Sequence, residues 1–205
     1  FQFPVGTPSR FLDFNWQFES PLPDFHVAPL QSGNFLYGGL FDPHFGHFMV
    51  ECIHRLWAWR HTGGTYDGLV FAPTPRHRPK ALLPGFVMQT LAWFGIPLER
   101  VIFLNEPRRF ACLHVPEVGK HRGRGPSPGY LAMLAKVLDL PEPHGHGDRL
   151  YLSRRRLPWN NGRFLAEAGL EYWLSSHGFE ILYPETMTLA EQVARYQGAV
   201  EILIA

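Results

Sequence analysis

Charged residues are scarce in this chain of 205 residues: Asp, Glu, Lys and Arg together make up 18%, and the formal net charge is +1. A surface with so little excess charge does not attract nucleic acid or an anionic membrane over its whole extent, which argues against general electrostatic binding to either. Lysine is rare too, because 16 of the 19 basic residues are Arg. The planar guanidinium suits phosphate and carboxylate, so this skew fits anion recognition, although a GC-rich genome would produce it as well.

Cysteine is also scarce, and long apolar runs are absent. The two cysteines, Cys52 and Cys112, are too few for a disulfide framework or a cysteine zinc site, and their apolar neighbours predict two small core residues. No apolar run reaches the roughly 18 residues of a membrane helix, and no signal peptide is visible after Phe1. We therefore expect a cytoplasmic chain that meets membranes only through partners. Because the sequence closes inside the apolar run 199–205, we also expect a fragment trimmed at both ends.

What the chain does contain is enough apolar material for a core, with 45% hydrophobic and 15% aromatic residues. Strand-like and helix-like stretches alternate with short links, which predicts an α/β fold with parallel sheets. The Pro- and Gly-rich stretch 141–147 is the best linker and divides the chain into two units, residues 1–140 and 141–205. The expected strands cover 27–30, 34–37, 66–72, 100–104, 150–153, 179–183 and 200–204. The expected helices cover 42–60, 84–94, 128–140, 162–177 and 188–197, and 105–127 is expected to be irregular.

Local signals support several helix ends. Asp42-Pro43 fits the start of a helix, and Thr188-Leu-Ala-Glu191 has the pattern of a capping box.

The helix expected over 42–60 has two different faces. A broad apolar stripe predicts core packing for Phe45, Phe48, Met49, Cys52, Ile53, Leu56 and Trp59. The opposite face carries His44, His47, Glu51, His54 and Arg55. A histidine beside a carboxylate can be held in one tautomer and accept a proton near pH 7. This face therefore fits a solvated surface, a general base in a cleft, or a metal site of His44, His47, Glu51 and His54.

A second candidate site is the basic loop after the strand expected at 150–153. Ser153-Arg-Arg-Arg156 stands at the carboxyl end of a parallel strand, where open α/β sheets bind ligands, and it leads toward a helix N-terminus. Arg154 to Arg156 and Arg163 are candidates for holding a phosphate or diphosphate; the alternative is a solvated loop. The glycine patterns of P-loop and dinucleotide-binding proteins are absent.

Two ordered sets of residues resemble glycosyltransferase family 61, whose bacterial members are often described as capsular polysaccharide biosynthesis proteins. Gly46-His-Phe-Met-Val-Glu-Cys-Ile-His-Arg-Leu-Trp57 resembles the family's N-terminal motif. The second half resembles the family in the order and spacing of Tyr151-Leu-Ser-Arg154, Arg163, Glu167, Gly178-Phe179, Pro184-Glu185, Leu189, Glu191-Gln192 and Ala199.

This resemblance implies a GT-B architecture of two facing Rossmann-like units, with the acceptor mainly at residues 1–140 and the donor at 141–205, a second unit that the chain includes only in part. It implies inverting transfer of a sugar from a nucleotide-sugar to a glycan or other hydroxyl acceptor in polysaccharide biosynthesis, without a cofactor or bound metal. His47 and Glu51 match the His and the acidic position of the family's N-terminal motif and are the candidate catalytic residues. The positions that match donor binding are Arg154, Arg163, Glu167, Glu185 and Gln192.

An inverting transferase needs a base for the acceptor hydroxyl and cations or dipoles for the leaving diphosphate. His47 and Glu51 are candidates for the first task, and Arg154 and Arg163 for the second. Two other functions also fit the sequence: a metal-dependent hydrolase built on the histidine face, and a non-catalytic carbohydrate- or nucleotide-binding module whose aromatic side chains stack on sugars.

Overall fold

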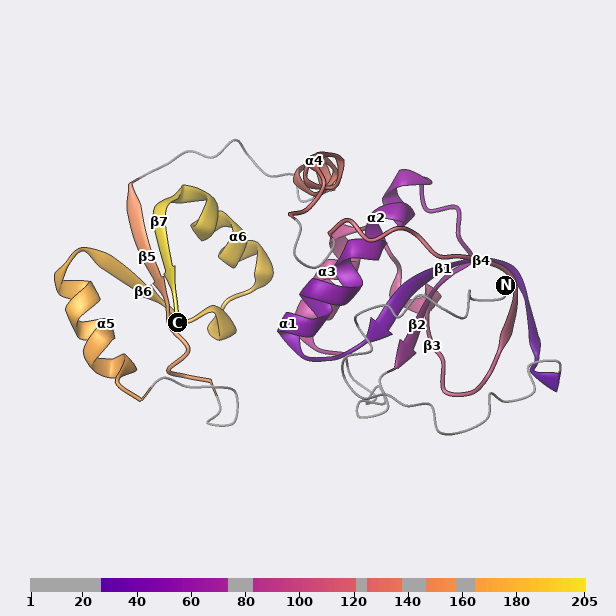
Figure 1. The fold of residues 1–205 in the computed structure, drawn as a ribbon, viewed down its shortest axis with the longest axis horizontal. Helices are drawn as coiled ribbons and strands as arrows, with labels where there is room; N and C mark the ends of the chain where they lie inside the picture. Colours follow the sequence, from indigo (N-terminus) through magenta and orange to yellow (C-terminus); the bar gives the residue numbers. More distant parts are fainter. Residues whose placement is uncertain (1–26, 74–82, 121–124, 138–146, 158–164) are drawn as a thin grey trace.

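The computed structural model describes residues 27–73, 83–120, 125–137, 147–157 and 165–205 (Figure 1). They form two separate sheets in which every strand pair is parallel, so the predicted α/β class with parallel sheets is confirmed. The first sheet has the order β3-β2-β1-β4 and the second the order β6-β5-β7. The predicted boundary at residues 140 and 141 lies outside the described residues. Within the described ranges, no helix is long and apolar enough to span a membrane.

The first sheet is built around one long strand. The bounds of its strands are β1 (Leu30–Phe41), β2 (Gly68–Pro73), β3 (Val101–Phe103) and β4 (Arg109–His114). In β1 the chain forms a single strand where two short ones were predicted, and the register shifts between Tyr37 and Gly39, which has a φ of 103°. Gly38 lets the ring of Phe71 pack against the strand, because a Cβ there would lie 2.5 Å from that ring.

The strand β4 was not predicted, because residues 105–127 were expected to be irregular. It pairs only with β1 and forms the edge of the sheet, so most of its side chains remain exposed. Cys112 is one of them. The prediction that Cys112 is a core residue is therefore wrong, whereas Cys52 is fully buried as expected.

The helices of the first unit bury the apolar residues that the sequence indicates. Their bounds are α1 (Phe45–His47), the π-helix η3 (Phe48–Cys52), α2 (Ile53–His61), α3 (Gly85–Trp93), the 3-10 turn η4 (Leu98–Arg100) and α4 (Pro128–Val137). Of the predicted stripe, Phe48, Cys52, Ile53, Leu56 and Trp59 are buried, and Met49 packs against them. Phe45 is the exception at 44% exposed, with its ring against Phe86 at 5.2 Å between centroids.

The first helical segment begins slightly later than predicted. His44, not Asp42, is the residue before its first turn. The Asp42 carboxylate instead accepts a hydrogen bond of 2.8 Å from the His44 amide. The chain is thus turned just ahead of the residues of the histidine face.

The second unit is a small three-layer arrangement. It contains β5 (Asp148–Leu152), α5 (Glu167–Ser176), β6 (Phe179–Leu182), the 3-10 turn η6 (Pro184–Thr186), α6 (Leu189–Gly198) and β7 (Ala199–Ile204). Figure 1 shows α5 and α6 on opposite faces of this sheet. The alternation of β5 explains this, because Leu150 and Leu152 join one apolar cluster, while Tyr151 joins the other with Leu174 and Phe179.

The predicted capping box of α6 is confirmed. The Thr188 hydroxyl accepts from the Glu191 amide at 3.2 Å, and the Glu191 carboxylate accepts from the Thr188 amide at 2.6 Å. The first residue of α6, Leu189, donates its amide to Gln89 Oε1 of α3 at 2.9 Å. This hydrogen bond joins the two units.

Candidate active site

The side chains of His47 and Glu51 contact each other on the first helical segment. His47 Nδ1 and Glu51 Oε1 are 3.1 Å apart, and the two side chains are 53% and 28% exposed. The carboxylate has only acceptor atoms, so Nδ1 is the donor in this contact, and Nε2 is the nitrogen of a neutral ring that can accept a proton. A neutral imidazole held in this tautomer can take a proton from a hydroxyl.

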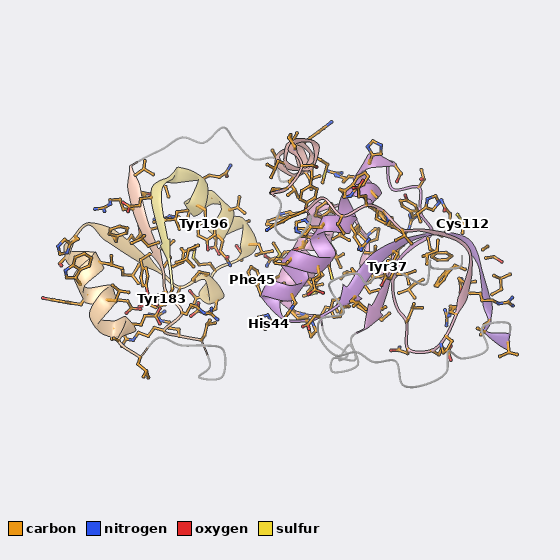
Figure 2. All side chains as sticks on the ribbon, viewed as in Figure 1. Tyr37, His44, Phe45, Cys112, Tyr183 and Tyr196 are labelled. Carbon is orange, nitrogen blue, oxygen red and sulfur yellow. The ribbon has the colours of Figure 1, made fainter. Side chains whose placement is uncertain are left out.

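The backbone under this pair is unusual. The five residues Phe48 to Cys52 form a π-helix between two α-helical pieces, and Glu51 belongs to it. Such single π-turns are rare in proteins, and those that occur are often found at functional sites. The ring of His44 lies 5.4 Å from that of His47, and Figure 2 shows His44 at the end of α1 nearest the second sheet in this view.

His54 and Arg55 do not belong to the same cluster. The ring of His54 lies 5.1 Å from that of Tyr130, and its burial, with Lys120 nearby, lowers the pKa of His54. Arg55 donates to the carbonyl of Pro116 at 2.8 Å. The predicted polar face is therefore divided: its first part is exposed, and the segment around residues 116–120 covers the rest.

The metal interpretation of this face is not supported. Across the described parts of the chain, no three His, Cys, Asp or Glu side chains come together as a ligand set for a metal ion. His54, which that interpretation needs, packs against Tyr130 instead.

The loop after β5 is held by two glutamates of α5. Ser153 Oγ lies 2.6 Å from Glu171 Oε1 and 3.0 Å from Glu167 Oε1. The Arg154 amide donates to Glu167 Oε1 at 2.6 Å, and the Arg155 amide to Ser153 Oγ at 3.0 Å. Glu167 and Glu171 are four residues apart and share one helical face, so together they fix the path of the chain as it leaves the sheet.

Glu167 was predicted to bind the donor, and the structure buries it, with 1% of its surface exposed. Its Oε1 also lies 3.3 Å from the hydroxyl of Tyr151. Burial without hydrogen bonds would be costly for a carboxylate, and these donors compensate for it at Oε1, whereas Oε2 is buried with no hydrogen-bond partner among the described residues. Its visible contacts are thus with the loop and strand that carry Arg154.

Glu171 is an acceptor for three side chains. Burial alone would raise its pKa, but hydrogen bonds from Ser153, Arg155 and Tyr183 outweigh burial and hold the pKa of Glu171 below its usual value. The Arg155 guanidinium donates to Glu171 Oε2 at 2.9 Å. The sequence analysis missed Glu171 and Tyr183; the spacing of Glu171 from Glu167 on one helix face was the available signal.

A pocket of about 420 Å³ lies beside this loop, lined by Arg155, Arg156, Leu157 and Tyr183. The guanidinium carbon of Arg156 lies over the ring of Tyr183, 3.8 Å from its centroid. Figure 2 shows Tyr183 at the end of the second sheet where Figure 1 marks the C-terminus. This is the carboxyl edge of the parallel strands, where sheets of this kind bind ligands.

The family model of glycosyltransferase 61 matches residues 45–205, more than half of the chain and both regions just described. The chain belongs to glycosyltransferase family 61. No curated protein and no solved structure gives a match. Family membership implies the transfer of a sugar from a donor to an acceptor, so this chain is a glycosyltransferase domain.

Three further residues of this glycosyltransferase were predicted to bind the nucleotide-sugar: Glu185, Gln192 and Arg163. Glu185 is exposed on the turn η6, directly after that strand. Gln192 donates its side-chain amide to the carbonyls of Pro184 at 2.9 Å and Met187 at 3.3 Å, and so ties α6 to the turn that carries Glu185. Arg163 lies outside the described residues.

Proposed function

We propose that this glycosyltransferase moves a sugar, with inversion at the anomeric carbon, from a nucleotide-sugar to a hydroxyl of a glycan. The observation that carries the proposal is the arginine-rich loop at the carboxyl edge of the second sheet, fixed from behind by Glu167 and Glu171. A parallel-sheet edge with several guanidinium groups suits a diphosphate. The family match adds that the reaction is sugar transfer, so we assign this site to the diphosphate of a nucleotide-sugar.

The domain division goes with this assignment. We propose a GT-B arrangement in which residues 1–140 hold mainly the acceptor and residues 141–205 hold the donor. Two α/β units with their own parallel sheets support it, as does the presence of one candidate site on each. A role in polysaccharide biosynthesis, including capsule formation, would suit a glycan acceptor.

The donor side supplies charge and position. Arg154 and Arg163 stabilise the negative charge that develops on the leaving diphosphate. The backbone of Arg154 is anchored to Glu167, so its side chain starts from a fixed point. Glu185 and Gln192 complete this side: Gln192 fixes the turn η6, and Glu185 can accept hydrogen bonds from sugar hydroxyls.

The acceptor side supplies the base. His47 Nε2 removes the proton from the acceptor hydroxyl while the oxygen attacks the anomeric carbon, and the bond from that carbon to the diphosphate breaks. Glu51 holds the imidazole through Nδ1 and stabilises the imidazolium that forms.

The test is a donor screen with the chain itself. Release of nucleoside diphosphate is measured from a panel of nucleotide-sugars with oligosaccharide acceptors, and NMR determines the anomeric configuration of the product. We expect turnover with a subset of donors and an inverted product. A retained configuration would contradict the proposed inversion, and the absence of turnover in a folded chain that binds nucleotide-sugars would favour a non-catalytic module.

A further inference from the structure

We propose that Arg156 and Tyr183 form a stacking platform for the nucleobase of the donor, distinct from the arginine that meets the diphosphate. This inference rests on the proposed function and specifies which part of the donor each residue reads. It starts from a pair of planar groups that the sequence analysis did not connect.

The fold brings these two residues together across neighbouring strands. Leu152 of β5 pairs with Leu182 of β6, and the Ser153 amide continues the pairing by donating to the Leu182 carbonyl at 2.9 Å. Tyr183 follows immediately on β6, while the loop turns Arg156 back over its ring at 3.8 Å. Both residues therefore line the pocket, at the same edge of the sheet.

A hydrogen bond to a buried carboxylate holds the tyrosine of this platform in place. Tyr183 forms a hydrogen bond with the buried carboxylate of Glu171, which also binds Ser153 and Arg155. Arg155 thus balances the charge of Glu171, whereas the guanidinium carbon of Arg156 lies over the Tyr183 ring, 3.8 Å from its centroid. A weakly hydrated planar cation fixed on an aromatic ring is well suited to stack on another flat π system.

The composition of the pocket selects the class of ligand. Among the residues that the structure describes, its lining consists of two arginines, a tyrosine and Leu157, with no carboxylate. A diphosphate alone requires charge, but it gains nothing from a ring or a leucine. A nucleobase uses both, since every base has a π face and an apolar body, and the volume of about 420 Å³ lies in the range of small-molecule sites.

The same unit provides a matched control. Arg149 also lies over an aromatic ring, that of Phe179, at 4.0 Å. This second pair involves the amino-terminal part of β5, and Arg149 is bound to Glu201 at 2.7 Å and to the His177 carbonyl at 2.9 Å. Its replacement removes an arginine from a ring without touching the pocket.

The experiment measures binding by calorimetry for UDP, GDP, CDP, ADP and inorganic pyrophosphate. The proteins are the parent chain and the variants Tyr183→Ala, Arg156→Lys and Arg149→Ala. For the nucleoside diphosphate that binds best, Tyr183→Ala should weaken affinity about tenfold or more, because the guanidinium on which the base stacks loses the ring that holds it. Arg156→Lys keeps the positive charge but replaces the planar guanidinium. It should therefore weaken the binding of the nucleoside diphosphate and leave the affinity for pyrophosphate unchanged. Arg149→Ala should change neither affinity.

Each outcome decides the inference. Unchanged nucleoside diphosphate binding in folded Tyr183→Ala and Arg156→Lys overturns the platform and leaves the proposed function standing. An equal loss of pyrophosphate and nucleoside diphosphate binding also overturns it, because the pocket would then read only phosphate. If none of the nucleotides binds the folded parent chain, the proposed function fails together with the platform. Should Tyr183→Ala not fold, Arg156→Lys alone decides.

Discussion

At the scale of single residues, the pair of His47 and Glu51 is exposed enough to be replaced without disturbing the core. We expect His47→Ala, and separately Glu51→Gln, to lower kcat by about 10²–10⁴, the usual contribution of a general base. The melting temperature and the donor Kd should remain those of the parent chain, because neither side chain belongs to the apolar cluster or to the donor unit.

His61 provides the control, since it is an exposed histidine at the end of the same helical segment. His61→Ala should leave kcat unchanged. If kcat survives in both His47→Ala and Glu51→Gln, the base lies elsewhere, with Asp42 and His44 as the next candidates. A collapse of the melting temperature would make the pair structural.

Glu171 makes a different kind of residue-scale prediction, one about pH. Its pKa in the folded chain lies below the usual value, so its hydrogen bonds add stability that is complete above the unfolded-state pKa of about 4.3 and is lost as the pH falls through the folded value. Glu171→Gln removes this titration. We expect the difference in unfolding free energy between parent and variant to shrink below about pH 4. Denaturant unfolding at several pH values measures it, and a difference independent of pH would contradict this account.

At the scale of elements, helix α6 tests the capping box directly. Thr188→Ala should cost about 1 kcal/mol of unfolding free energy, because one amide of the first turn loses its acceptor. Glu191→Ala should cost less in that background than in the parent chain, since the two side chains are partly coupled through their hydrogen bond, while the Thr188 backbone amide still donates to the carboxylate. A double-mutant cycle from two-state melts gives both numbers, and additive effects would show that the two contacts are independent.

The edge strand β4 and the buried helical segment give a second prediction at this scale. Cys112 is exposed, whereas burial raises the pKa of Cys52 to about 12. A thiol reagent at pH 8 should therefore modify one cysteine quickly and the other only on unfolding, because the thiolate is the reactive form. Cys112→Ser should abolish the fast reaction; fast modification that persists in this variant would mean that Cys52 is accessible.

The elements also show how far sequence reasoning extends. The helix α6 was predictable because Thr188 and Glu191 are near neighbours whose contact is local. β4 was missed because its stability comes from pairing with β1, some eighty residues earlier, and not from its own half-exposed sequence. The π-turn around Glu51 could not be read from the apolar stripe: Phe48 and Cys52 within it and Leu56 after it are buried as a regular helix would predict.

The same limit applies to the candidate site. The sequence pointed to the arginine run and to Glu167, but the two-glutamate anchor requires α5 to pack across the end of β5. The stack of Arg156 on Tyr183 requires two strands to end side by side. Contacts of this kind depend on tertiary placement, so residue type and spacing do not reveal them.

At the scale of the whole molecule, the two units divide the work in the proposed function, and Arg154 tests that division. Arg154→Ala should weaken binding of a nucleoside diphosphate by about ten- to a hundredfold, because a charge-assisted contact is lost, with a smaller effect on the free nucleoside. Calorimetry compares the two ligands. Arg195→Ala is the control, since Arg195 pairs with Glu180 and with Asp148 at the opposite end of β5. Equal affinity of Arg154→Ala and the parent chain for the diphosphate would remove Arg154 from the donor site.

The hydrogen bond from the Leu189 amide to Gln89 joins these two units through a backbone donor at a helix end. The first amides of a helix have no hydrogen-bond acceptor inside it. Here the Leu189 amide of α6 finds its acceptor on Gln89 of α3, one hundred residues away in the chain. Any rocking of one unit against the other that separates α3 from α6 must therefore uncover this amide to water. The hydrogen-exchange rate of the Leu189 amide therefore reports how often the two units move apart.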